Sequence, residues 1–239
     1  MNSNPPTITT KCQLCGDAVT RERAFMGEKE CFAEAIVHCD DCEAEADAEE
    51  RARKASQDFD HRWAQRTPLI YHRAKESSVA PWLLPALSWN RSQHPFGMGI
   101  TGASGQGKSM GLALALRRAR KSFKWISGGE LRELSQDASM GENWERSEAR
   151  QKWEKACSID VLAIDDLDKA RFTPAWAEKL FDLVKTRNEA MLPTFWTANN
   201  GLGQLQTKIA SNCQDGHTAA AIERRLCQGV LLLSPTASP

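Results

Sequence analysis

The sequence predicts an α/β fold, a parallel β-sheet with helices on both faces, preceded by a small cysteine-rich module. After Pro68, short apolar segments alternate with segments rich in Leu, Ala and charged residues, and strands that alternate with helices build parallel sheets. Five of the eight cysteines lie within the first 42 residues. The five expected strands are 96–101, 123–127, 159–164, 193–198 and 230–233, and the clearest expected helices are 110–121, 176–187 and 219–226.

Composition and charge exclude several classes of protein. Hydrophobic residues make up 41% of the chain and charged residues 26%, the balance of a globular protein and not of a disordered chain or a small disulfide scaffold. Lys plus Arg and Asp plus Glu both number 31, so any nucleic-acid contact must come from a local patch. The N-terminus carries no signal-like segment, and apolar runs such as 230–233 are far shorter than the ~20 residues of a membrane span. We therefore expect a cytoplasmic protein without a membrane partner.

Four N-terminal cysteines form two Cys-x-x-Cys pairs separated by 23 residues. They are Cys12, Cys15, Cys39 and Cys42. Each pair directs two thiolates at one point, and two pairs complete a tetrahedral structural zinc site. Cys31 and His38 are spare ligands that could replace one of the four. The other interpretation, reduced cysteines without metal, leaves a short segment with too little core to fold. We expect residues 1–45 to be a zinc-binding module that docks a partner.

The segment that follows predicts a helical linker at 46–67. From Glu43 to about Arg66 the chain consists mainly of Ala, Glu, Arg and other helix-forming residues, and acidic residues precede basic ones, the order that suits a helix dipole. The segment lacks an apolar stripe, which favours a solvated helix. The remaining residues, 68–239, form the expected α/β domain.

The most specific motif is Gly102–Ser109, which fits G-x-x-x-x-G-K-[ST] between a predicted strand and a predicted helix. Glycines let backbone N–H groups approach phosphates, and the helix N-terminus attracts the same anion. We expect Lys108 to reach the β- and γ-phosphates and the Ser109 hydroxyl to ligate Mg²⁺. The predicted nucleotide-binding residues are Gly102, Ala103, Ser104, Gly105, Gln106, Gly107, Lys108, Ser109 and Met110.

Two later strands end in polar residues. Asp165 and Asp166 directly follow the apolar strand Val161–Ile164. We expect Asp165 to hold Mg²⁺ and Asp166 to orient and activate the attacking water. The alternative is an acidic turn after a buried strand. Thr194–Ala198 delivers Asn199, which would hold that water, although Asn-Asn-Gly is also good turn chemistry.

Two basic segments carry further hypotheses. Arg225, with Arg224 as its neighbour, could contribute charge to the nucleotide site of another subunit, or could simply be solvated or paired with Glu223. The segment 117–125 is dense in Arg and Lys and contains Phe123 and Trp125, a composition that suits single-stranded DNA and equally the solvated end of a helix. Trp144 and Trp153 are stacking candidates or core residues.

These motifs, taken in order over about residues 68–233, resemble the AAA+ ATPases, and more narrowly the DnaC/DnaI-type replicative helicase loaders and the IstB-like transposition ATPases. The resemblance implies ATP as substrate, Asp165 and Asp166 as the Walker B pair, and Asn199 as sensor 1. It also implies Arg225 as the arginine finger, with Arg224 not excluded, and adenine contacts from Leu69–Tyr71. Because only residues 234–239 follow the final predicted strand, we expect no C-terminal helical lid and weak ATPase activity without partners.

The resulting prediction is an ATP-dependent loader of a hexameric replicative helicase onto single-stranded DNA, self-associating through its AAA+ domain. Three alternatives stay open: an IstB-like transposition helper, a P-loop kinase of a small molecule, and a nucleotide-gated adaptor without useful hydrolysis.

Overall fold

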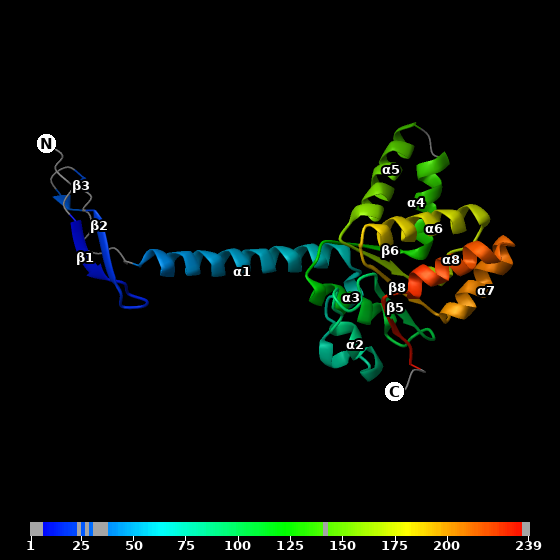
Figure 1. Cartoon of the computed structure of the whole chain (residues 1–239), viewed down its shortest axis with the longest axis horizontal. Coiled ribbons are helices and arrows are strands. Elements are labelled where there is room, and N and C mark those ends of the chain that lie inside the picture. The colour runs from blue at the N-terminus through cyan, green and yellow to red at the C-terminus, as the bar shows by residue number, and fades with distance from the viewer. Residues whose placement is uncertain (1–6, 23–24, 27–28, 31–37, 141–142, 236–239) are drawn as a thin grey trace. The chain divides into compact units, whose positions relative to one another are not determined.

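The computed structural model describes residues 7–22, 25–26, 29–30, 38–140 and 143–235. The chain divides into two compact units, Met1–His61 and Arg62–Pro239, which are described separately (Figure 1). The division falls inside helix α1 (Asp40–Arg66). The limits 1–45, 46–67 and 68–239 stay predictions.

The first unit contains a β-hairpin that the sequence did not predict. Strands β1 (Thr7–Lys11) and β2 (Ala18–Glu22) pair antiparallel, and the hydroxyls of Thr9 and Thr20 lie 3.0 Å apart across them. Strands β3 (Phe25–Met26) and β4 (Lys29–Glu30) form a second, shorter pair. Strands rich in Thr and charged residues lack the apolar alternation that marks a half-buried strand, so the sequence carried no clear signal for these pairs.

Helix α1 starts with acidic residues and ends with Arg66, in line with the helix dipole. Its exposed middle supports the solvated interpretation, with an i,i+4 pair between Glu50 and Lys54 at 2.9 Å. The last turn of α1, in contrast to its middle, contains a buried side chain. Trp63 is only 3% exposed, and its indole N–H donates to the carbonyl of Ala113 at 3.0 Å. Phe59, four residues earlier on the same helix, is 6% exposed, so the last two turns of α1 carry a short apolar face that the expectation of a helix without an apolar stripe missed.

The second unit is built on a five-stranded sheet in which every paired strand is parallel. The strands are β5 (Gly97–Thr101), β6 (Phe123–Ser127), β7 (Val161–Asp165), β8 (Thr194–Ala198) and β9 (Val230–Leu233). Their order is β6-β7-β8-β5-β9. All five expected strands are confirmed, each within two residues of its predicted limits, and the α/β class with a parallel sheet is confirmed with them.

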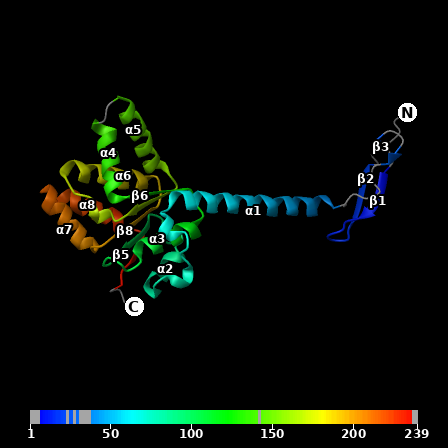
Figure 2. The ribbon, with the colours of Figure 1, turned by 180° about the vertical axis from the view of Figure 1, so that it is seen from behind.

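Helices cover both faces of this sheet, as Figure 2 shows from behind. The α-helices are α2 (Leu84–Leu87), α3 (Lys108–Ala119), α4 (Gly128–Met140), α5 (Asn143–Ser158), α6 (Pro174–Glu189), α7 (Leu202–Cys213) and α8 (Gly216–Cys227). Short 3₁₀ turns lie at η1 (Leu69–Tyr71), η2 (Glu76–Ser78), η3 (Pro81–Leu83) and η4 (Leu167–Lys169).

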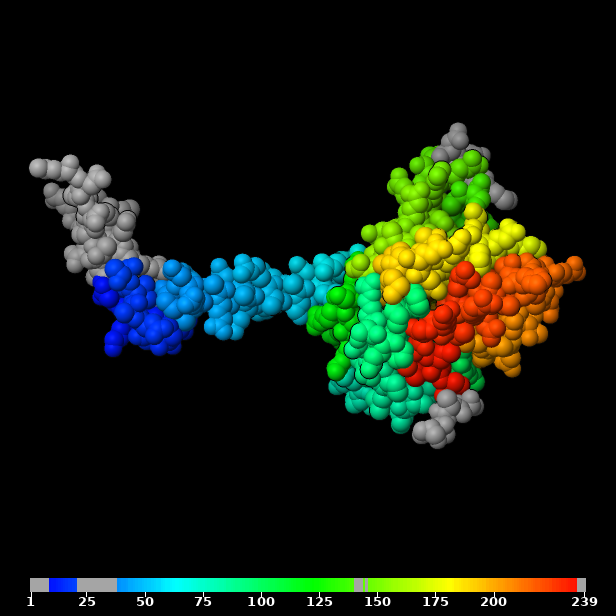
Figure 3. All heavy atoms as spheres, in the orientation of Figure 1, coloured from blue at the N-terminus to red at the C-terminus, as the bar shows by residue number. Residues whose placement is uncertain are grey.

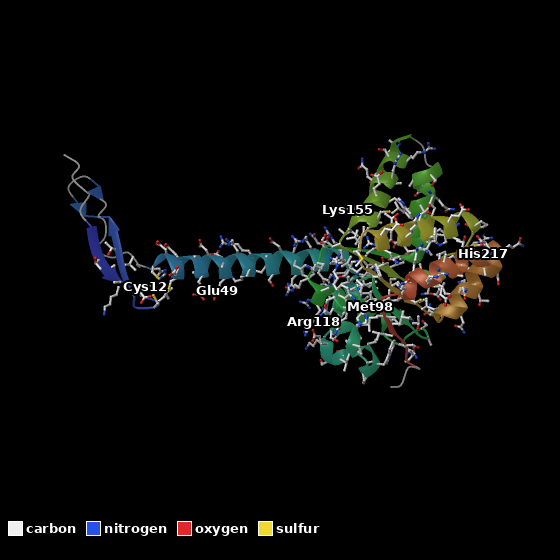
Figure 4. All side chains as sticks on the ribbon, viewed as in Figure 1. Cys12, Glu49, Met98, Arg118, Lys155 and His217 are labelled. Atoms are coloured by element: carbon white, nitrogen blue, oxygen red, sulfur yellow. The ribbon has the colours of Figure 1, made fainter. Side chains whose placement is uncertain are left out.

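Successive side chains of each strand point to opposite faces of the sheet, and both faces are packed. Leu162, Ile164 and Trp196 belong to a cluster of buried residues shared with α4–α8, and α6–α8 form one continuous surface in the space-filling view (Figure 3). On the other face, Phe195 meets Trp89 edge to face at 4.8 Å. Met98, labelled in Figure 4, is completely buried. Among the helices of the described ranges, none combines the length and hydrophobicity that crossing a membrane requires.

A fully buried arginine fastens β8 to the end of α5. Arg187 of α6 is 0% exposed, and burial lowers its pKa to about 10. Its guanidinium donates five hydrogen bonds, to Thr194 Oγ1 and to the carbonyl oxygens of Ala156, Cys157, Ile159 and Pro193. These bonds satisfy carbonyls at the end of α5 and at the approach to β8.

We expect Arg187→Met to lower the free energy of unfolding by about 3 kcal/mol, because the buried carbonyl oxygens lose their donors. Urea unfolding followed by tryptophan fluorescence measures this change. Arg171→Met, at an exposed position, is the control and should leave the midpoint nearly unchanged. Equal midpoints for the two variants would contradict the assigned role.

Candidate functional site

The phosphate loop connects β5 to α3 and lines a cavity of about 280 Å³. Gly105 and Gly107 have φ values of +83° and +80°, a left-handed conformation that favours glycine. Lys108 is 5% exposed, and its Nζ donates to the carbonyl of Ala103 and to Asn199 Oδ1, each at 2.9 Å. The cavity is lined by Tyr71, Ser104, Gly105, Gly107, Lys108, Ser109, Met110, Asp166, Lys169 and Asn199.

The lining contains six of the nine predicted nucleotide-binding residues. Gly102, Ala103 and Gln106 lie in the same loop without lining the cavity. Gly102 and Gln106 are in close contact, since a Cβ on Gly102 would lie 2.4 Å from Gln106 Oε1. Ala103 contributes the carbonyl that receives the Lys108 amine. The three residues therefore shape the loop whose other members face the cavity.

A carboxylate and a hydroxyl meet at the start of α3. Ser109 Oγ donates to Asp165 Oδ1 at 2.8 Å, and Thr197 Oγ1 donates to the same oxygen at 2.6 Å. Burial raises the pKa of Asp165, and these two hydrogen bonds oppose the rise. A hard oxygen pair of this kind fits Mg²⁺. Thr197, which the sequence analysis gave no role, also accepts the backbone N–H of Asp166 at 2.8 Å.

Asp166 directly follows β7 and faces the phosphate cavity. Its φ of 53° places a non-glycine residue in the left-handed region, a strained conformation of the kind that clusters at functional sites. Its Oδ2 lies 2.6 Å from Lys169 Nζ, and Lys169 also lines the cavity. The sequence analysis gave Lys169 no role, because a lysine four residues after Asp165 carries no general signal.

A third carboxylate fixes the position of Asn199. Asp168 is 3% exposed. Its Oδ1 accepts the backbone N–H of Asn199 and its Oδ2 accepts Asn200 Nδ2, both at 3.0 Å, while its carbonyl accepts Lys208 Nζ. Asn199 therefore both contacts Lys108 and belongs to the turn that the Asn-Asn-Gly sequence suggested.

The η1 turn brings one of its three residues to the cavity. Leu69 and Ile70 are 82% and 78% exposed, whereas Tyr71 lines the cavity and its ring lies 5.7 Å from the ring of Trp125. Burial raises the pKa of Tyr71, and a hydrogen bond with Ser109 opposes the rise. Adenine contact by this turn stays a prediction.

The two candidate arginines lie on α8, away from the residues that line the phosphate cavity. The Arg225 guanidinium covers the ring of Phe181 at 4.5 Å, and its Nη1 donates to the carbonyl of Ala221 at 3.3 Å. Arg224 is exposed. Neither residue lines the phosphate cavity of its own chain, and a role in a neighbouring subunit stays a prediction for both.

The four paired cysteines converge in the first unit. Within the described residues, the Sγ atoms of Cys12, Cys15, Cys39 and Cys42 all lie within 4.8 Å of one another, and those of Cys15 and Cys39 are 3.6 Å apart. A zinc tetrahedron with bonds of about 2.3 Å separates its sulfurs by about 3.8 Å, so the cluster fits zinc. His38 is not a member of it, and Cys31 lies outside the described residues.

The thiols of this cluster differ in acidity. The backbone N–H of Cys15, above all, lowers the pKa of Cys12 to about 6. A hydrogen bond with the Cys39 side chain is the main cause that raises the pKa of Cys42. Thiols this close resist joint ionisation, and a divalent cation at their centre removes that resistance by binding all four as thiolates.

A basic groove of about 550 Å³ lies beside the C-terminal end of α3. Its cationic lining residues are Lys75, Arg117, Arg118 and Arg120. Arg118, labelled in Figure 4, pairs with Glu76 at 3.0 Å, and the Arg117 guanidinium lies 5.0 Å from the Trp63 ring centre. Of the two stacking candidates, Trp144 is 69% exposed and Trp153 packs against the main core.

The parallel five-stranded sheet, with a phosphate-loop motif between β5 and α3, defines the class of this domain as a phosphate-loop α/β fold. No family model matches the sequence, and no curated protein matches it. The structure is similar to a crystal structure of DnaI, with a TM-score of 0.57 and 19% identity over 70% of this chain and 94% of that one. It is also similar to a crystal structure of the DnaC helicase loader, with a TM-score of 0.50 and 16% identity over 72% of this chain and 98% of that one. The chain therefore has an AAA+ fold of the DnaC/DnaI type.

We expect the purified full chain to contain one zinc ion, and Cys42→Ser to reduce zinc content to a small fraction, because three thiolates hold the metal far more weakly than four. Elemental analysis after dialysis gives the ratio. Cys227→Ser, outside the cluster, is the matched control and should keep its zinc. Equal zinc contents in the two variants would contradict the site.

Proposed function

We propose that the chain is an ATP-dependent loader of the replicative DNA helicase onto single-stranded DNA, with ATP binding and hydrolysis acting as a switch. The observation that carries the nucleotide part is the 2.8 Å contact between Ser109 and Asp165, next to the cavity that Lys108 enters. The loader part is supported by the likeness to a DnaC structure described as a helicase loader.

In this proposal, the loop N–H groups and Lys108 bind the β- and γ-phosphates of ATP. Ser109 and Asp165 hold Mg²⁺, which neutralises charge on the phosphates when bound. Asp166 orients the attacking water and accepts its proton, while Asn199 fixes the position of that water. Tyr71, beside the cavity, contacts the nucleoside.

Assembly completes the site. Because Arg224 and Arg225 do not line the phosphate cavity of their own chain, the proposed arginine finger acts on the nucleotide of an adjacent copy, where a cation stabilises transition-state charge. Arg224 is the more exposed of the two, whereas Arg225 is the one that the family resemblance implies. Both arginines stay candidates. The dependence on a neighbour accounts for the weak activity expected of the isolated chain.

We assign the two other proposed partners, the helicase and single-stranded DNA, to the cysteine module and to the basic groove. The cysteine module, held by a closed four-thiolate zinc site without an open ligand position, serves a structural role, and we assign it the docking of the hexameric helicase. The basic groove beside α3 suits the phosphate backbone of single-stranded DNA. An IstB-like transposition helper shares the nucleotide site, so the identity of the captured partner separates the two functions.

We expect Asp166→Asn to retain or strengthen ATP affinity and to reduce phosphate release by roughly 100-fold or more, because an amide cannot accept the proton of the attacking water. A phosphate-release assay with DNA and helicase present measures the rate. Asp182→Asn, on the exposed side of α6, is the matched control. If the wild-type chain binds ATP but releases no phosphate, a nucleotide-gated adaptor replaces the ATPase; phosphate transfer to a small acceptor would identify a kinase.

We expect the full chain to capture the replicative helicase encoded in the same genome, and Cys42→Ser or a zinc chelator to abolish the capture, because the docking module loses its metal. A pull-down with tagged full-length variants measures this, with Cys227→Ser as control. Failure of the wild-type chain to bind a hexameric helicase would refute the loader, and capture of a transposase would support the transposition helper.

A further inference from the structure

Two lysines, not one, enter the phosphate cavity. Lys108 belongs to the phosphate loop, and Lys169 enters from the η4 turn that directly follows the acidic pair. The Lys169 side chain is 61% exposed, and its Nζ lies 2.6 Å from Asp166 Oδ2. The nucleotide site as proposed above gives Lys169 no task.

The backbone of Lys169 is held by a hydrogen bond, whereas its side chain is exposed. Its backbone N–H donates to the carbonyl of Asp166 at 3.0 Å, and the preceding residue, Asp168, is buried and fully hydrogen-bonded to the turn after β8. The four-carbon side chain extends from this fixed point into the cavity. An exposed ion pair between residues three apart contributes only about 0–1 kcal/mol, so a stronger anion nearby can replace Asp166 as the partner.

Triphosphate binding brings such an anion. The terminal phosphate must lie within reach of the water that Asp166 orients, so two negative groups face each other across a short distance. This repulsion disfavours ATP binding, and a cation that lies between Asp166 and the terminal phosphate, in addition to Mg²⁺ at Asp165, reduces it. Lys169 already contacts one of these groups and lines the space that the other enters.

Resting on the proposed ATPase function, we propose that Lys169 is a second phosphate-binding lysine that exchanges Asp166 for the terminal phosphate when a triphosphate is bound. The exchange frees Asp166 Oδ2 to orient the attacking water. The water oxygen then forms a bond to the γ-phosphorus, the bond to the β–γ bridging oxygen breaks with its electron pair leaving on ADP, and the water proton passes to Asp166. After phosphate release, Lys169 returns to Asp166.

This exchange gives the site a means of distinguishing ATP from ADP. The diphosphate lacks the group that draws Lys169 away, so the Lys169–Asp166 pair persists with ADP bound. Lys108 and the loop N–H groups also contact the β-phosphate, which both nucleotides carry, so they retain much of their binding to ADP. Lys169, whose phosphate contact exists only with a triphosphate, therefore adds to the discrimination between the two nucleotides that a binding-and-hydrolysis switch requires.

The test compares the affinity of full-length Lys169→Met for a non-hydrolysable ATP analogue and for ADP, by titration calorimetry in Mg²⁺. A lost charge-assisted hydrogen bond should weaken analogue binding roughly tenfold or more, whereas ADP affinity should stay within about twofold. Lys179→Met, an exposed lysine on α6, is the matched control. Lys169→Arg, which keeps the charge, should retain most of the discrimination.

A double-variant cycle with Asp166→Asn sharpens the result. Without the competing carboxylate, Lys169 is free for the phosphate, so Asp166→Asn should tighten analogue binding, and Lys169→Met should remove that gain. Unchanged discrimination in Lys169→Met, or equal losses for the analogue and ADP, would overturn the inference while leaving the ATPase proposal intact. A wild-type chain that binds neither nucleotide would instead refute the ATPase proposal itself.

Discussion

The hydrogen bond from Ser109 to Asp165 is the contact on which the nucleotide site depends, because it joins the first turn of α3 to the end of β7. The two residues are 56 positions apart, and β5 and β7 are not neighbours in the sheet; β8 lies between them. Thr197 of β8 bridges the gap, since its hydroxyl donates to Asp165 and accepts the N–H of Asp166. The start of α3 and the ends of β7 and β8 are therefore held together by side-chain hydrogen bonds.

Strand β8 is fastened at both ends by buried charges of opposite sign. At its start, Arg187 binds Thr194 and the carbonyl of Pro193. At its far end, Asp168 binds the backbone of Asn199 and the side chain of Asn200. Each charge is almost completely buried and is compensated by hydrogen bonds from several partners, the condition under which a buried charge is tolerated. This arrangement fixes the position of Asn199 relative to Lys108.

The elements that the sequence predicted well are those with a local signal. The phosphate loop, the apolar strand before Asp165 and the two Cys-x-x-Cys pairs each need only a short segment to be recognised. Thr197, Asp168 and Lys169 could not be assigned a role in this way, because their meaning depends on which strand lies beside which. The strand order β6-β7-β8-β5-β9 makes Thr197 a neighbour of Asp165, and no spacing along the chain reveals it. The role of Arg187 could not be predicted for the same reason, since its hydrogen-bond partners come from two separate segments of the chain.

The same logic explains the charged run that forms α1. Its composition predicted a helix correctly, but the contacts that hold it come from a few residues near its two ends. Near its start, Cys39 and Cys42 meet Cys12 and Cys15 from the hairpin, so bound zinc would tie the hairpin to the helix. In its last turn, Trp63 contributes a buried ring and a hydrogen bond to the carbonyl of Ala113. A helix whose middle is solvated thus needs strong, specific contacts at its ends, and a metal cluster and a tryptophan are among the few side-chain groups that supply them in so short a length.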